Sequence, residues 1–114
     1  MINLYDETAQ ALEKHHIKWN DIKYIGSKDI KIPIGIFIKL AKQTFYEDDF
    51  GIQFIPKDLV MVAKKGIFIR EEYDGSEWWD YIPFNYHGKT VTDLHTLANS
   101  DGWKTLKGTY NTQT

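Results

Sequence analysis

The sequence predicts an α+β domain, a small and mainly antiparallel sheet with two or three helices mostly on one of its faces. Three apolar runs separated by turn residues indicate a three-stranded meander over residues 59–82. A shorter alternating run predicts another strand over residues 21–26, closed by a glycine. Two further stretches carry apolar residues at helical spacing. The chain has 114 residues, which suffices for one core, and we expect a single domain over residues 1–107.

The first helix is predicted over residues 4–15. Asn3 is a suitable N-cap, and Asp6 follows three residues later as in a capping box. Three apolar residues then fall at helical spacing, namely Tyr5, Ala9 and Leu12.

The segment from Ile30 to Phe45 fits two patterns. Its isoleucines alternate as in a strand, yet apolar residues also recur at the spacing of a helix. Pro33 suits the first turn of a helix and not a central strand, and residues 40–43 favour helix. We therefore predict a helix over residues 33–44, with Ile30–Ile32 extended before it.

Turn residues divide the meander. Asp74-Gly75 is a favoured pair for a tight type I′ turn, and a two-residue turn at Lys64-Lys65 or Lys65-Gly66 joins the first two strands. After Pro83 the pattern weakens. There we expect a short helix from Thr92 to Ala98, a turn over residues 102–106 and a frayed tail over residues 108–114.

The hairpin register assigns each side chain of the meander to a face, because side chains alternate along a strand. One face carries valines and isoleucines, together with Glu71, Trp78 and Asp80. We expect the helices to cover this face. The opposite face would then be bare, and it carries the five residues that we select as candidates for an interface: Met61, Phe68, Arg70, Trp79 and Tyr81.

Three interpretations of this aromatic face stay open. The C-terminal segment, with Trp103, Leu106 and Tyr110, covers it as ordinary core. Alternatively, the face binds a protein partner or a second copy, since aromatic residues and arginine dominate binding hot spots. In the third interpretation, a sugar or base stacks on Trp79 and Tyr81.

Motifs for catalysis and cofactors are few. The chain has no cysteine, no nucleophile elbow, no P-loop and no GxGxxG, so we predict no catalytic residues, no cofactor and no disulfide. The four histidines lack a metal-binding spacing, and no metal site is predicted. The carboxylates of Glu71 and Asp80 share a face, which makes a small hydrolase with a carboxylate pair an alternative.

Charge and hydropathy limit the partners. The net charge is −2 and Arg70 is the only arginine, which speaks against binding to nucleic acid. No apolar run approaches the ~20 residues that span a bilayer, so we expect no membrane and a cytoplasmic location.

A stretch of the meander, Glu72-Tyr73-Asp74-Gly75-Ser76-Glu77-Trp78-Trp79, preceded by Asp58-Leu59-Val60, resembles short proteins of unknown function from phages and prophage regions of low-GC Gram-positive bacteria. The resemblance runs from about Trp19 to Trp79. It implies an accessory role in the host cytoplasm and carries no reaction or site residues. The leading hypothesis is therefore a non-catalytic phage or prophage accessory protein that acts through protein contacts on the aromatic sheet face, with a homodimer as one form of that contact.

Overall fold

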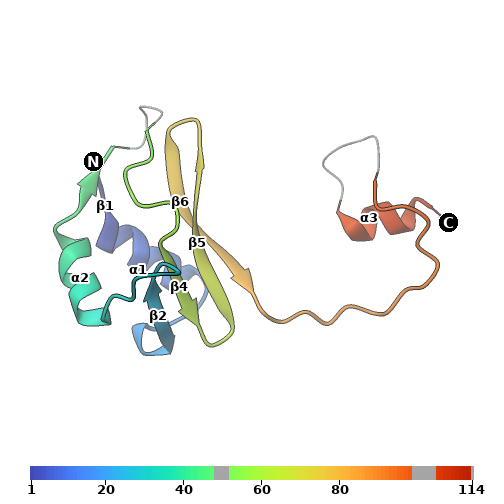
Figure 1. The fold of residues 1–114 in the computed structure, drawn as a ribbon, viewed down its shortest axis with the longest axis horizontal. Coiled ribbons are helices and arrows are strands. Elements are labelled where there is room, and N and C mark those ends of the chain that lie inside the picture. The colour runs from blue at the N-terminus through green and yellow to red at the C-terminus, as the bar shows by residue number, and fades with distance from the viewer. Residues whose placement is uncertain (48–51, 99–104, 114) are drawn as a thin grey trace.

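The computed structural model describes residues 1–47, 52–98 and 105–113, and it confirms the α+β fold class (Figure 1). A four-stranded antiparallel sheet has the strand order β2-β4-β5-β6, and β1 pairs with β3 in a separate two-stranded sheet. Part of the acidic connector at residues 47–49 and most of the turn expected at residues 102–106 lie outside the described residues. The elements are β1 (Ile2–Asn3), α1 (Leu4–Lys14), a 3-10 turn η1 (Trp19–Asp21), β2 (Ile22–Gly26), α2 (Ile34–Lys42), β3 (Phe45–Tyr46), β4 (Val60–Ala63), β5 (Gly66–Tyr73), β6 (Ser76–Pro83) and α3 (Leu106–Asn111).

Both predicted N-terminal helices are confirmed. The Asn3 side chain caps α1 by accepting a hydrogen bond of 3.0 Å from the amide of Asp6. Helix α2 begins directly after Pro33, and the residues before it are extended, with Lys31 bridged to Gly26 on the edge of β2.

Helix α1 ends in a Schellman motif that has a histidine where glycine is usual. The amide of His16 donates to the carbonyl of Glu13, and the amide of Ile17 donates to that of Leu12. His16 adopts a left-handed φ of 57°, which a side chain with a Cβ disfavours. The turn redirects the chain toward η1 and β2.

The predicted meander and its register are confirmed. Val62 pairs with Ile67, which places a two-residue turn at Lys64-Lys65. Asp74 and Gly75 both have positive φ, as a type I′ turn requires. Strands β5 and β6 pair along their whole length, from Gly66 opposite Pro83 to Tyr73 opposite Ser76.

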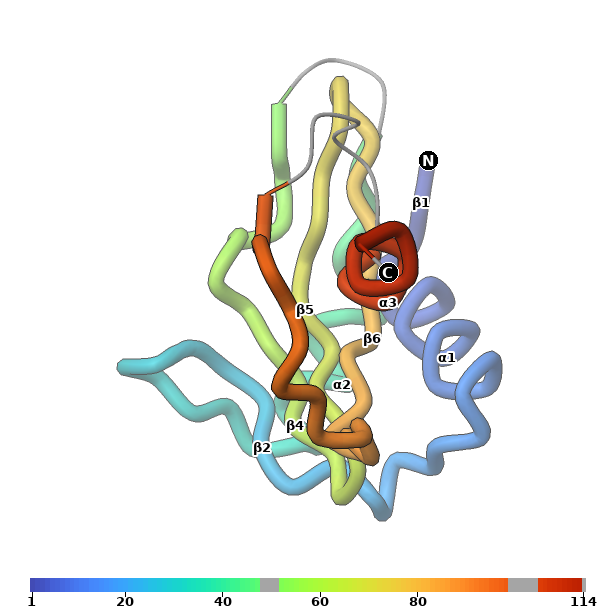
Figure 2. The backbone as a smooth tube through the Cα atoms, turned by 90° about the vertical axis from the view of Figure 1, so that its right-hand side faces the viewer, coloured from blue at the N-terminus to red at the C-terminus, as the bar shows by residue number. Residues whose placement is uncertain are grey.

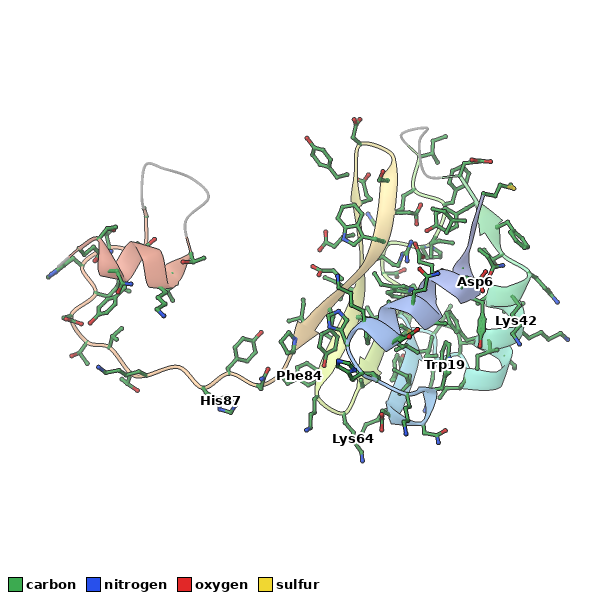
Figure 3. The ribbon with its side chains drawn as sticks, turned by 180° about the vertical axis from the view of Figure 1, so that it is seen from behind. Asp6, Trp19, Lys42, Lys64, Phe84 and His87 are labelled. Atoms are coloured by element: carbon green, nitrogen blue, oxygen red, sulfur yellow. The ribbon has the colours of Figure 1, made fainter. Side chains whose placement is uncertain are left out.

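The predicted placement of the helices on the sheet is wrong. Helices α1 and α2 cover the face that carries Phe68, Arg70 and Trp79, which we call the inner face. The valine and isoleucine face, called the outer face below, has no helix on it (Figures 1 and 3). The physical reason is that Glu7 and Thr8 on α1 form hydrogen bonds with the Arg70 guanidinium and the Trp79 indole, so this helix provides partners for the polar groups of the inner face.

The C-terminal part differs from expectation. Residues 92–98 form no helix. Residues 84–98 instead run away from the sheet, and α3 includes part of the tail that was expected to be frayed (Figure 1). The radius of gyration is 17.8 Å, whereas a compact domain of about 100 residues has a value near 13 Å. We call residues 84–98 together with α3 the arm. Seen from the side of the arm, it passes in front of the sheet while α2 lies behind the sheet (Figure 2).

The left-handed histidine predicts a stabilising substitution. His16→Gly should raise the free energy of unfolding by about 1 kcal/mol, because glycine adopts positive φ without a clash of Cβ. Urea denaturation measures the change. The control Lys14→Gly, in the last turn of α1, should lower the free energy of unfolding by about 1 kcal/mol. Equal losses in both variants would show that the turn gains nothing from glycine.

Candidate functional site

The five residues predicted to form an exposed interface lie on the inner face, beneath the helices. Met61 and Phe68 are fully enclosed, Arg70 and Trp79 are buried, and Tyr81 is half-buried. The interpretation of these five side chains as a bare surface is therefore wrong. The described residues of the C-terminal segment do not cover them either, because α1 occupies that place, and Trp103 lies outside the described residues.

Arg70 lies at the centre of a buried polar cluster. One guanidinium nitrogen donates to Glu7 on α1 at 2.8 Å, and the other donates to Glu77 on β6 at 2.9 Å and to the Tyr46 hydroxyl at 3.3 Å. The guanidinium also lies over the Trp79 ring, 4.8 Å from its centroid. Burial by itself lowers the pKa of Arg70, but the charge of Glu7 and the hydrogen bonds from Glu77, Glu7 and Tyr46 outweigh it, and the pKa is raised.

The partners of Arg70 are themselves held in place. Both carboxylate oxygens of Glu77 accept backbone hydrogen bonds, from Phe54 at 2.7 Å and from Ile55 at 3.2 Å. The Tyr46 hydroxyl donates to Glu7. The pKa of Tyr46 is raised, first by burial and then by this hydrogen bond to a carboxylate. The cluster thus joins α1, β3, β5, β6 and the segment before β4 into one unit.

Trp79 cannot serve as a platform for a sugar or base. Its indole N–H donates to the Thr8 hydroxyl at 2.9 Å, and the Arg70 guanidinium lies over its ring. Only 8% of the residue is exposed. The alternative function of stacking a ligand on Trp79 therefore has no accessible surface, and Trp79 belongs to the core.

Glu71 and Asp80 both lie on the outer face. Asp80 pairs with Ile69 and Glu71 pairs with Trp78, so the two carboxylates are diagonal neighbours on adjacent strands. Neither carboxylate lines any of five well-formed cavities in the described part of the chain. In the part of the chain that the structure describes, no group of three or more His, Asp or Glu side chains is placed to hold a metal ion. Across the same residues, no helix combines the length and apolarity needed to cross a membrane.

The outer face is the apolar surface that the fold leaves open. Its side chains form cross-strand rows in which Val62 lies beside Ile67, Ile67 beside Ile82, and Val60 beside Ile69. Most of these side chains are only half-buried. The tryptophan of this face, Trp78, is 41% exposed. The side chains on this face include Tyr24, Val60, Val62, Ile67, Ile69, Glu71, Tyr73, Ser76, Trp78, Asp80 and Ile82.

The arm is the second open apolar surface. Its first residue, Phe84, still extends the sheet through an amide hydrogen bond of 2.7 Å to the carbonyl of Lys65. Farther along, the side chains of Tyr86 and Leu97 are 78% and 77% exposed, and Leu106 on α3 is 64% exposed. Exposed apolar side chains at this density are unusual for a segment without a partner.

Comparison with protein-family models, with curated proteins and with solved structures gives no match to this chain. The functional argument therefore depends on the geometry of the chain itself.

The buried cluster predicts a large cost for removing its cation. Arg70→Met should lower the free energy of unfolding by about 3–5 kcal/mol, because it leaves the carboxylate of Glu77 buried without a counter-charge. Chemical denaturation measures this loss. The control Glu72→Met, an exposed position on the same strand, should change stability by less than about 0.5 kcal/mol. Similar small changes in both variants would contradict a stabilising role for the cluster.

The raised pKa of Tyr46 predicts a loss of stability at alkaline pH. In the unfolded chain the phenol ionises near pH 10, whereas in the folded chain it stays neutral to higher pH. Its contribution is therefore complete below about pH 10 and declines as pH rises toward the folded pKa. The stability difference between wild type and Tyr46→Phe should be constant below about pH 9 and shrink toward about pH 11. In Tyr73→Phe, which alters an exposed tyrosine, no such trend is expected.

Proposed function

We propose that this chain is a non-catalytic protein-contact module that pairs with a second copy of itself. In this pairing the arm of each copy lies across the outer face of the other copy. The observation that carries the proposal is the coexistence of two open apolar surfaces, the outer face and the arm, on one molecule. Self-association of this kind keeps the protein-contact function expected from the sequence and moves the contact to the opposite face of the sheet.

Charge supports the match between the two surfaces. The outer face carries the carboxylates of Glu71 and Asp80 between its apolar rows. Among the described residues of the arm, Lys89 and Lys107 are cationic, and the carboxylate of Asp93 already accepts a hydrogen bond from Tyr110. Opposite charges of this kind orient a contact that apolar burial stabilises.

The dimensions also fit a stable dimer. Four strands of this length form a face of about 20 Å by 20 Å, or roughly 400 Å². A reciprocal exchange covers two such faces and the matching surfaces of two arms, roughly 1,600 Å² in total, which is the standard size of a specific interface. Twofold symmetry closes the assembly at two copies and leaves no open end for further growth.

The reach of the arm favours another copy over the arm's own sheet. In this structure the arm leads away from the sheet to which it is attached (Figure 1). Fifteen extended residues, from 84 to 98, reach up to about 50 Å, which is enough to cross to a neighbouring molecule. An arm that folded back would need a sharp reversal directly after Pro83.

The dimer can be tested by light scattering coupled to size exclusion over a range of concentrations. The wild type should be a dimer. Ile69→Ser with Trp78→Ser on the outer face, and separately Tyr86→Ser with Leu97→Ser on the arm, should each shift the equilibrium toward monomer by at least about tenfold, since each removes two apolar anchors. The control Ile30→Ser with Ile36→Ser removes two exposed isoleucines elsewhere and should stay dimeric.

Cross-linking then distinguishes exchange between copies from a fold-back within one copy. The chain has no native cysteine, so Ile69→Cys and Leu97→Cys can be placed in separate copies of the protein. Mixing the two should give a mixed disulfide dimer in high yield. A monomer at all concentrations, or a disulfide that forms only when both cysteines are in one chain, would overturn the proposal.

The phage or prophage role belongs to the same proposal and is supported by the resemblance of the β5–β6 hairpin segment. A gene neighbourhood made of phage structural or regulatory genes is the expected result. A neighbourhood of ordinary metabolic genes would contradict it.

A further inference from the structure

We infer that the sheet end near the Lys64-Lys65 turn binds a small phosphomonoester that carries an apolar or aromatic group. Two adjoining cavities, of about 450 and 630 Å³, open there and share Lys64, Lys65 and Tyr81 as lining residues. Both volumes lie in the range of small-molecule sites. The lysines of this site lie on the β4–β5 turn and not on the outer face, so their test does not depend on the proposed dimer, although the second cavity also takes Phe84, Asn85 and His87 from the start of the arm.

The lining holds two lysine ammonium groups against one carboxylate, and it offers many hydrogen-bond donors. In the first cavity the lysines are joined by His15 and His16, and in the second cavity by Asn85 and His87. A lysine ammonium has three donors and no acceptor, and the hydroxyl, imidazole and amide groups add further donors. A ligand that satisfies such a lining must be rich in acceptors, as a phosphate group is.

The lysines are available to a ligand. Lys64 and Lys65 are both exposed, and among the described residues neither forms an ion pair. The lining includes one carboxylate, that of Asp21, which already accepts a hydrogen bond from the amide of Lys18 at 3.1 Å. Two adjacent ammonium groups match the two negative charges of a phosphomonoester near neutral pH.

Tyr81 forms an aromatic wall that both cavities share. The Tyr81 ring packs against the His15 ring, with 4.5 Å between centroids, and against Phe68 at 4.7 Å. The ring also lies so close to Gly66 that a Cβ there would clash with it. Glycine at position 66 therefore allows the wall to stand where it does, and the shared wall holds its position without a ligand.

The second cavity supplies an apolar surface beside the cations. Phe84, at the start of the arm, is 49% exposed and lines this cavity together with Pro83. Figure 3 shows Lys64 and Phe84 at the same end of the sheet, with His87 farther along the arm. This arrangement suits a phosphate on the lysines and an organic group on the phenylalanine ring.

The test is a titration of the full chain with phenyl phosphate, followed by the backbone amide resonances of Lys64, Lys65 and Gly66. Saturable shifts at these amides are expected. Lys64→Gln with Lys65→Gln should weaken binding by about tenfold or more, because charged hydrogen bonds to the phosphate are lost. The control Lys28→Gln with Lys39→Gln removes the same charge from exposed positions elsewhere and should bind as wild type does.

A second variant tests the organic part of the ligand. Phe84→Ser should weaken binding of phenyl phosphate several-fold and leave binding of inorganic phosphate unchanged. Benzoate, which has the ring without the phosphate, should bind more weakly than phenyl phosphate. The absence of saturable shifts, or equal weakening by the two lysine pairs, would overturn the site and leave the dimer proposal untouched.

Discussion

The ion pairs of Arg70 determine how the remaining elements assemble. A buried guanidinium is costly unless charged partners surround it, and here Glu7 and Glu77 lie at 2.8 and 2.9 Å. Glu7 belongs to the first helix and lies 63 residues from Arg70 in the chain. Their pairing fixes α1 on the inner face and, with the Thr8 to Trp79 hydrogen bond, sets the position of the helix along the strands. The choice of inner and outer face thus follows from a polar contact, although most of the area beneath α1 is apolar.

This choice decides which surface is left for function. Both faces of the sheet are apolar, but α1 and α2 both pack on the inner face. The outer face therefore has no helix on it. Half-buried valines and isoleucines are common on a small open sheet. An exposed Trp78 among them enlarges the apolar surface in contact with water, which is unfavourable for an isolated molecule. The arm has the complementary problem, since its exposed Tyr86 and Leu97 lack a surface to pack on. In the proposed dimer, one symmetric contact with a second copy covers both surfaces.

Local patterns predicted the elements well and their assembly less well. The Asn3 cap, the Asp74-Gly75 turn and the parity of the hairpins are properties of neighbouring residues, and the structure confirms them. The prediction for Phe68 and Trp79 failed because hairpin parity sorts the side chains into two faces but does not determine which of two apolar faces the helices cover. A signal was present in the sequence, since Leu4, Thr8 and Leu12 form the buried stripe of α1 and Glu7 lies beside it. A carboxylate next to the apolar stripe of a helix indicates a buried cation as its partner. The local sequence does not identify which cation that is.

The two cavities near the Lys64-Lys65 turn exist because α1 is shorter than the strands that it covers. Helix α1 has eleven residues and spans about 16 Å, whereas β5 and β6 have eight residues each and span about 27 Å. One helix therefore cannot cover the whole inner face. At the end near the Asp74-Gly75 turn, the segment that includes Phe54 and Ile55 covers the part of the inner face that α1 does not reach, and its amides donate hydrogen bonds to Glu77. At the opposite end α1 stops at Lys14, and the strained turn at His16 redirects the chain toward η1 and β2. Tyr81 is thus left at the edge of the core beside the Lys64-Lys65 turn, half-buried and bordered by donors. Both ends of the inner face extend beyond α1, and they differ in the residues that lie there. The lysines at this end are the feature from which we infer an anion site.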